Sequence, residues 1–492
     1  MAAVITDDSI VPTLGAQRRQ TECAVPILAK PLREGEEVTI CCIIFLSEMK
    51  VKGFHSLAVL AILLVVSGAT LACSLATRLF EREPTPPPRP TTDSLIVYAG
   101  VDGNIYTIDR VGGNQTAITD DASLSFTAGD TGRIYQYPTW APDGDHLAFI
   151  ELIGSGQLDL RARLLSVSVG SGETVETFSS DVYLPFYLYW SPDSRNISFL
   201  SNGTGEGGLV LHIAAADGSG SHIAGTGQPY YWDWSPEEDE IFIHTGGAAA
   251  DNPEARLAFM SMDDPFPSQE IDLQPASFQA PAWSPDGETI AMAVETETGE
   301  ALVLQERLSG KQRTISEIDG AVAFAWSPDG SQLAYTASPP EGSDTANKEL
   351  YVVQPSRAEE KRLLASGLIA GFFWSPDGQH LAVFKPALPG QGDNSLIAFQ
   401  QPSRINLALQ VVEVESGEVR QLITFAPSDS FLNLLPFYDQ YQRSMTLWSP
   451  DSREMVVAAL DEQEQPGIYV IDALEGGSKR IADGDLAFWS WK

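Results

Sequence analysis

Short β-prone stretches separated by turn residues recur along the chain from Ser94 to its end. One unit consists of residues 290–292, 301–304, 313–315 and 323–326, and each intervening segment contains a glycine. Four such stretches are typical of the strands of one small sheet, and a repeat about every 40 to 50 residues is typical of β-propeller blades. We name the stretches B, C, D and A, where the A stretch is the one that ends in Trp.

A five-residue motif, Trp-Ser-Pro-Asp-Gly, joins the A stretch to the next B stretch. It occurs at residues 283–287, 326–330 and 374–378, and looser copies begin at Trp140, Trp190, Trp234 and Trp448. Pro fixes φ for a tight turn, Asp can accept a hydrogen bond from the backbone two residues on, and Gly accepts a positive φ. The motif therefore predicts a tight A–B turn in every blade.

Some copies of the motif depart from this pattern. Ala141 replaces Ser in the first copy, and Ser194 and Ser452 replace Gly. The copy at Trp234 continues as Ser-Pro-Glu-Glu, so we expect its turn to be the least regular.

The number and order of the repeats predict the fold class, an all-β, single, closed propeller of eight four-stranded blades. The array begins at a B stretch, residues 95–98, and ends at an A stretch, so residues 485–491 should pair beside 94–99 and close the ring. Seven blades with an irregular insertion are the alternative. We expect the repeated Trp residues to pack between blades rather than to form ligand platforms: Trp140, Trp190, Trp234, Trp283, Trp326, Trp374, Trp448 and Trp489.

These motif copies resemble the Tol-type (WD-like) β-propeller family, and the resemblance covers residues 94–492. Family members include binding modules and the non-catalytic propellers of prolyl-oligopeptidase-like peptidases. This chain departs from the peptidases because it ends at the last A stretch and contains no Gly-x-Ser-x-Gly. The resemblance therefore implies a fold more strongly than a function.

The segment before the repeats predicts export and attachment to a membrane. Residues 49–73 combine two lysines, a long apolar run and small residues before Cys73, as in a secretory signal, and the end resembles a lipoprotein lipobox. We expect lipidation at Cys73; the alternative is an uncleaved membrane anchor. Residues 1–48 are interpreted as unstructured or as an over-extended reading frame, and the Pro-rich residues 74–93 as a linker. Either anchor places residues 94–492 outside the cytoplasm, on a bacterial membrane.

The charge, cysteine and histidine content of the chain disfavours several classes of function. The first 92 residues carry 9 basic and 9 acidic residues, so the net charge of −36 belongs to the remainder, which disfavours binding to nucleic acid. All four cysteines precede the repeats. The histidines lack metal-ligand spacing, although His212 and His222 could meet across a hairpin. We therefore predict no cofactor, no metal and no catalytic residue, and expect a monomer.

Loop lengths suggest where a partner would bind. The long B–C segments, 337–348 and 385–407, and the long D–A segments, 119–138 and 425–446, should lie on one face of a propeller. Apolar and aromatic residues gather there, so this face is predicted to bind a protein, peptide or glycan. The partner-binding candidates are Tyr230, Tyr231, Phe431, Phe437, Tyr438 and Tyr441. The alternatives are that the 425–446 segment plugs the central channel, or that the chain is a propeller lyase or glycosidase with its site in the propeller mouth.

Overall fold

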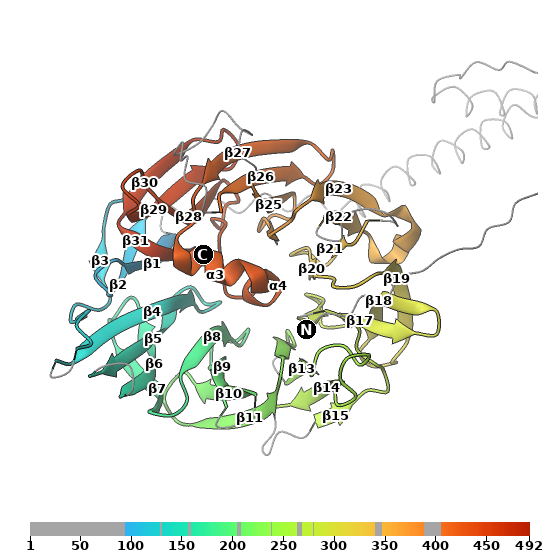
Figure 1. Ribbon diagram of the computed structural model, residues 1–492, viewed down its shortest axis with the longest axis horizontal. Coiled ribbons are helices and arrows are strands. Elements are labelled where there is room, and N and C mark those ends of the chain that lie inside the picture. Colours follow the sequence, from blue (N-terminus) through green and yellow to red (C-terminus); the bar gives the residue numbers. More distant parts are fainter. Residues whose placement is uncertain are drawn as a thin grey trace, which may run out of the picture. The chain divides into compact units, whose positions relative to one another are not determined.

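The computed structural model describes residues 94–492, except for 128–129, 156–158, 204–207, 238, 263–267, 279, 340–346 and 388–404. The predictions for residues 1–93, including the signal, the Cys73 anchor and the linker, lie outside the described residues. Figure 1 shows the described part as small sheets arranged in a ring around the short helices α3 and α4. This arrangement is a β-propeller of eight blades, as the repeat count predicts.

The first four blades consist of β31 (Gly484–Trp489), β1 (Leu95–Gly100), β2 (Ile105–Asp109) and β3 (Thr116–Ala117); β4 (Gly132–Trp140), β5 (His146–Gly154), β6 (Leu160–Ser168) and β7 (Thr174–Ser180); β8 (Pro185–Trp190), β9 (Asn196–Asn202), β10 (Leu209–Ala215) and β11 (Ser221–Gly227); and β12 (Tyr230–Trp234), β13 (Glu240–Thr245), β14 (Arg256–Ser261) and β15 (Ser268–Glu270).

The last four blades consist of β16 (Ala282–Trp283), β17 (Thr289–Thr296), β18 (Gly299–Glu306) and β19 (Gln312–Ile318); β20 (Phe324–Trp326), β21 (Leu333–Ala337), β22 (Lys348–Val353) and β23 (Arg362–Gly367), with the 3₁₀ helix η1 (Pro355–Glu360); β24 (Gly371–Trp374), β25 (His380–Pro386), β26 (Leu407–Glu413) and β27 (Val419–Phe425); and β28 (Glu454–Leu460), β29 (Pro466–Asp472) and β30 (Ser478–Ala482). In the last blade the inner strand is reduced to a bridge between Trp448 and Met455.

The ring closes through a blade built from both ends of the repeat array. The last strand, β31, is hydrogen-bonded to β1 in antiparallel register, with Ile96 opposite Trp489 and Val97 opposite Phe488. Figure 1 shows this junction of the first and last coloured strands. The predicted pairing of residues 485–491 beside 94–99 is confirmed, and the seven-blade alternative is excluded.

The Ser-Pro-Asp-Gly turns take their shape from side-chain hydrogen bonds within the turn. In one copy the Ser284 hydroxyl donates to Asp286 Oδ1 (2.5 Å), and the same oxygen accepts the Glu288 N–H (3.0 Å). Gly287 has φ +71°, the left-handed conformation that the motif predicts. In the irregular copy the Ser235 hydroxyl instead donates to Asp239 (2.9 Å), four residues on.

The repeated Trp side chains join neighbouring blades. In five blades the indole N–H donates to the backbone carbonyl of the residue just before the corresponding Trp of the preceding blade. Seven of the eight repeated Trp side chains are buried, and Trp374 is partly exposed. Each of these five Trp residues thus combines apolar packing with one polar contact to the adjacent sheet, whereas the indole nitrogens of Trp283 and Trp489 have no hydrogen-bond partner among the described residues. The five bonds run from Trp140 to Phe488 (3.2 Å), Trp190 to Thr139 (3.4 Å), Trp326 to Ala282 (3.1 Å), Trp374 to Ala325 (3.1 Å) and Trp448 to Phe373 (3.3 Å).

Candidate functional site

The connection between β27 and β28 lies in the middle of the ring (Figure 1). It contains α3 (Asp429–Leu434), the 3₁₀ helix η2 (Leu435–Phe437) and α4 (Tyr438–Tyr441). Ser428 caps α3 by accepting the Phe431 N–H on its hydroxyl oxygen (3.2 Å). We call residues 428–446 the plug, because their apolar side chains pack into the core around the channel.

The plug contains four of the six predicted partner-binding aromatics, and most of these are not exposed. Phe431 and Tyr438 are buried, Tyr441 is partly buried, and Phe437 is 46% exposed. Of the other two candidates, Tyr230 is buried in β12 and Tyr231 is partly buried. Within the plug, only Phe437 therefore presents a large aromatic surface to solvent.

The plug forms hydrogen bonds with the channel-facing edges of innermost strands, where a neighbouring strand would otherwise pair. The innermost strand of each blade has one edge facing the channel, where backbone groups lack a strand partner. The Gln440 side chain accepts from the Trp232 N–H (3.2 Å) and donates to the Trp232 carbonyl (3.0 Å), as a neighbouring strand would. Asp439 Oδ2 accepts the Ala280 N–H (3.0 Å). The Ser444 hydroxyl makes a similar contact by donating to the Leu188 carbonyl (2.5 Å).

A backbone irregularity in β8 directs one tyrosine at the plug. Tyr187 has φ +49° at a β-bulge, a conformation that costs a bulky residue about 1 kcal/mol or more. Its hydroxyl donates to the Gln440 carbonyl (2.6 Å) and accepts from the Gln440 amide (2.9 Å). Its ring meets Tyr441 edge to face at 4.4 Å. These contacts offset the backbone cost and fix the position of α4.

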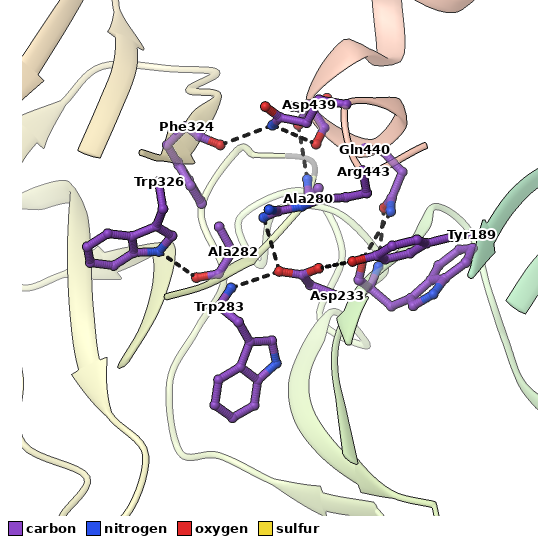
Figure 2. Close-up of polar contacts among 12 residues, drawn as sticks. Tyr189, Asp233, Ala280, Ala282, Trp283, Phe324, Trp326, Asp439, Gln440 and Arg443 are labelled. Carbon is purple, nitrogen blue, oxygen red and sulfur yellow. Dashed lines mark hydrogen bonds and ion pairs between the residues drawn. The ribbon is translucent and has the colours of Figure 1, made fainter. Parts of the chain in front are cut away.

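A buried carboxylate, Asp233 of β12, ties two blades and the plug to its own blade (Figure 2). It accepts the Tyr189 hydroxyl (2.8 Å) and the Trp283 N–H (2.8 Å), and its Oδ2 lies 3.0 Å from Arg443 Nη2 of the plug. Burial raises the pKa of Asp233, and the Arg443 charge partly offsets that effect. Burial is the largest single effect on Arg443 and lowers its pKa, but Asp233 together with Tyr189, Tyr187 and Asp439 raises the pKa of that guanidinium overall. Each charge of the pair therefore favours the ionised form of the other.

Asp439 is less well compensated than Asp233. Its Oδ1 atom has no hydrogen-bond partner among the described residues, and its side chain is buried. Burial raises the pKa of Asp439 to about 6, against the opposing effect of the Ala280 N–H. This carboxyl group therefore changes protonation in a pH range where an ordinary aspartate stays ionised.

On the face of the A–B turns the channel remains open as a hollow of about 600 Å³. We call it the funnel. Its wall consists of Trp side chains and of the prolines that begin the turns, and Arg443, at 21% side-chain exposure, lies on its floor beside Asp233. Trp491, 43% exposed, and the partly exposed Trp374 present indole surface to this space. The lining prolines are Pro142, Pro192, Pro236, Pro285, Pro328, Pro376 and Pro450.

The sequence did not predict this site, because tight turns indicate structure and long loops indicate function. Asp233 carried a signal, since a carboxylate within Tyr-Tyr-Trp-Asp-Trp must be paired if that strand is buried. Gln440 carried none, because its partner, Trp232, is 208 residues away in sequence.

Two of the histidines that lack metal-ligand spacing in the sequence, His212 and His244, lie within blades. His212 Nε2 is 2.8 Å from the Ser201 hydroxyl, its ring stacks on Phe199, and burial lowers its pKa to about 4. His244 stacks on Phe278 at 3.9 Å. Across the part of the chain that the structure describes, no three His, Cys, Asp or Glu side chains are grouped to hold a metal ion.

Residues 94–492, apart from the gaps given above, include no helix with the length and apolar character needed to cross a membrane.

Comparison with known proteins does not assign the chain to a family. No family model matches the chain, and no curated protein does. Solved structures that are similar include a prolyl endopeptidase (11% identity, 72% of this chain and 50% of that one, TM-score 0.48), so this chain spans about half of that structure's length. An oligogalacturonate lyase from Vibrio parahaemolyticus is 14% identical over 77% of this chain and 96% of its own (TM-score 0.46). TolB from Acinetobacter baumannii is 12% identical over 68% and 80% (TM-score 0.34). Likenesses at this level carry no functional argument.

Proposed function

We propose that this chain is a non-catalytic binding propeller, tethered to the outer side of a bacterial membrane, which captures a segment of a partner protein in the funnel. The observation that carries the proposal is the funnel itself, a hollow of about 600 Å³ walled by aromatic and proline side chains and closed below by the plug. Concave, mostly apolar sites with a few fixed polar groups are the usual binding sites of proteins.

The charges around the funnel favour a neutral or basic partner. The floor carries Arg443, but that cation is matched by Asp233, and residues 93–492 carry the whole net charge of −36. Because like charges repel, an anionic ligand should associate slowly and bind weakly. A lyase or glycosidase would instead need an acid or base presented to its substrate, whereas Asp233 is held by three partners.

The tether is inferred from the sequence before the repeats. Residues 49–73 supply a secretory signal ending at Cys73, and the Pro-rich residues 74–93 would hold the propeller away from the membrane surface. This arrangement presents the propeller to partners outside the cytoplasm.

Partner capture from extracts of the native membrane tests the site. The Trp491→Ala variant should capture at least about tenfold less partner than the native chain, since buried aromatic anchors dominate interface energies. Phe437→Ala, an exposed aromatic that does not line the funnel, is the matched control and should capture as the native chain does. Loss of capture by Phe437→Ala with retention by Trp491→Ala would move the site to the long-loop face, and a captured glycan would contradict the protein partner.

Mass spectrometry of the membrane-extracted chain tests the tether. We expect an N-terminal Cys73 carrying acyl chains and no peptides from residues 1–48. A Cys73→Ser chain that stays in the membrane would show an uncleaved anchor instead.

A further inference from the structure

The funnel wall is also the place where the chain enters the propeller. Ser490 and Trp491 line the funnel, and Ser490 is hydrogen-bonded in both directions to Leu95, the first residue of β1. The Ser490 N–H donates to the Leu95 carbonyl (2.8 Å), and the Leu95 N–H donates to the Ser490 hydroxyl (3.1 Å). β1 starts opposite Trp489, at the turn face, and runs away from it. The described part of the chain therefore begins, at Ser94, beside the rim of the funnel.

The Pro-rich segment before Ser94 is of a kind that binds to walls of aromatic side chains. Residues 86–92 read Pro-Pro-Pro-Arg-Pro-Thr-Thr. Proline fixes φ and lacks an N–H, so such a run favours an extended polyproline II conformation, and segments of this kind dock onto grooves lined by aromatic side chains. At about 3.1 Å per residue, seven residues extend about 22 Å.

Charge complementarity supports the same match. Arg89 is the only charged residue among 86–92. Each proline of the funnel wall is followed directly by an acidic residue of the same A–B turn, so the turns that form the wall are acidic: Asp143, Asp193, Glu237, Asp286, Asp329, Asp377 and Asp451. A cationic segment is therefore favoured at this wall over an anionic one.

We propose that residues 86–92 of the same chain dock in the funnel and occupy it until a partner displaces them. A segment tethered this close has an effective concentration in the millimolar range, so even weak intrinsic affinity keeps the funnel occupied. The proposal rests on the proposed function in taking the funnel as a binding surface. It adds that the linker regulates that surface, because a partner must compete with it.

A labelled peptide with the sequence of residues 86–92 tests this without any partner. Its binding is followed by fluorescence anisotropy with the full native chain and with a full-length chain in which residues 86–90 are replaced by Gly and Ser. The exchanged chain should bind the peptide, and this binding should weaken at high salt. The native chain should bind the peptide at least about tenfold more weakly than the exchanged chain does. In the exchanged chain, Trp491→Ala should weaken binding by at least about tenfold. Pro328→Ala, with a smaller expected effect, serves if Trp491→Ala fails to fold.

Three results would overturn the proposal: no binding by the exchanged chain, equal binding by the native and exchanged chains, or binding that neither funnel substitution weakens. Concentration-dependent dimerisation of the native chain that the exchange abolishes would place the segment in a second copy and also overturn it. Because the proposed function is tested by partner capture, a funnel that captures a partner but ignores the peptide would reject this inference alone.

Discussion

At the residue scale, the two serines that replace Gly in the turn motif offset their strained backbone with a hydrogen bond. Ser194 and Ser452 stand where other copies carry Gly and keep the left-handed backbone, with φ +62° and +59°. Each serine hydroxyl accepts a backbone N–H from the turn of the preceding blade, Asp143 N–H on Ser194 and Asp377 N–H on Ser452, both at 3.0 Å. The serine thus exchanges backbone strain for a hydrogen bond between blades.

Because strain and hydrogen bond oppose each other at Ser452, substitution by Ala and substitution by Gly should change the free energy of unfolding by different amounts. Ser452→Ala keeps the strained backbone and leaves the Asp377 N–H unpaired, so the free energy of unfolding should fall by about 1–2 kcal/mol. Ser452→Gly loses the same bond but relieves strain of about 1 kcal/mol, so it should stay within about 0.5 kcal/mol of the native chain. Urea unfolding measures both, and equal losses in the two variants would contradict the account.

Asp439 should make stability depend on pH. Its folded-state pKa, about 6, lies above its ordinary value, so protonation favours the folded state and stability should rise as pH falls through 6. Arg443, Tyr231 and Tyr438 are the neighbouring charged or titratable groups. At pH 8 the free energy of unfolding of Asp439→Asn should exceed that of the native chain by an amount on the order of 2 kcal/mol, and this gain, measured by thermal unfolding, should shrink at pH 5. A gain that is the same at both pH values would rule out Asp439 as the titrating group.

At the element scale, the plug shows where the sequence was ambiguous. The apolar run Phe-Leu-Asn-Leu-Leu-Pro-Phe-Tyr at 431–438 fits both an exposed binding loop and a channel plug, because periodicity cannot tell which surface covers it. The deciding contacts join Gln440 to Trp232 and Asp439 to Ala280, which are far apart in sequence. The plug was predictable as an alternative, and its strand-like pairing was not.

The two neighbouring aromatics of the plug should respond differently to truncation. Tyr438 is buried against Phe372, with ring centroids 5.3 Å apart, so Tyr438→Ala should destabilise the chain by about 3 kcal/mol. Phe437→Ala, at the exposed position, should change stability by less than about 1 kcal/mol. Thermal unfolding of the two variants measures this, and similar losses would mean that Phe437 is buried in solution.

At the scale of the whole molecule, the repeat order was sufficient to predict the closure. An array that starts at a B stretch and ends at an A stretch can bury its open edges only by pairing its two ends, as β1 and β31 do. The binding face was not predictable in this way. Loop length drew attention to one face, whereas the funnel is made by seven tight turns whose prolines are separated by dozens of residues.

Closure also predicts the effect of shortening the chain. Deleting residues 487–492 removes Trp489 and Phe488 from the composite blade and exposes β1, so the melting temperature should fall sharply. Deleting Lys492 alone is the control and should change it little. A truncated chain that melts like the full chain would contradict closure by these residues.

The central claim is that the ligand binds in the funnel rather than on the long-loop face. Hydrogen–deuterium exchange of the full chain, alone and with its captured partner, tests this most directly. The account predicts slower exchange in the A–B turns, such as residues 284–289 and 375–380, and in 490–492, with unchanged exchange in 119–127 and 181–184. Protection confined to those long-loop segments, with the turns unchanged, would contradict it.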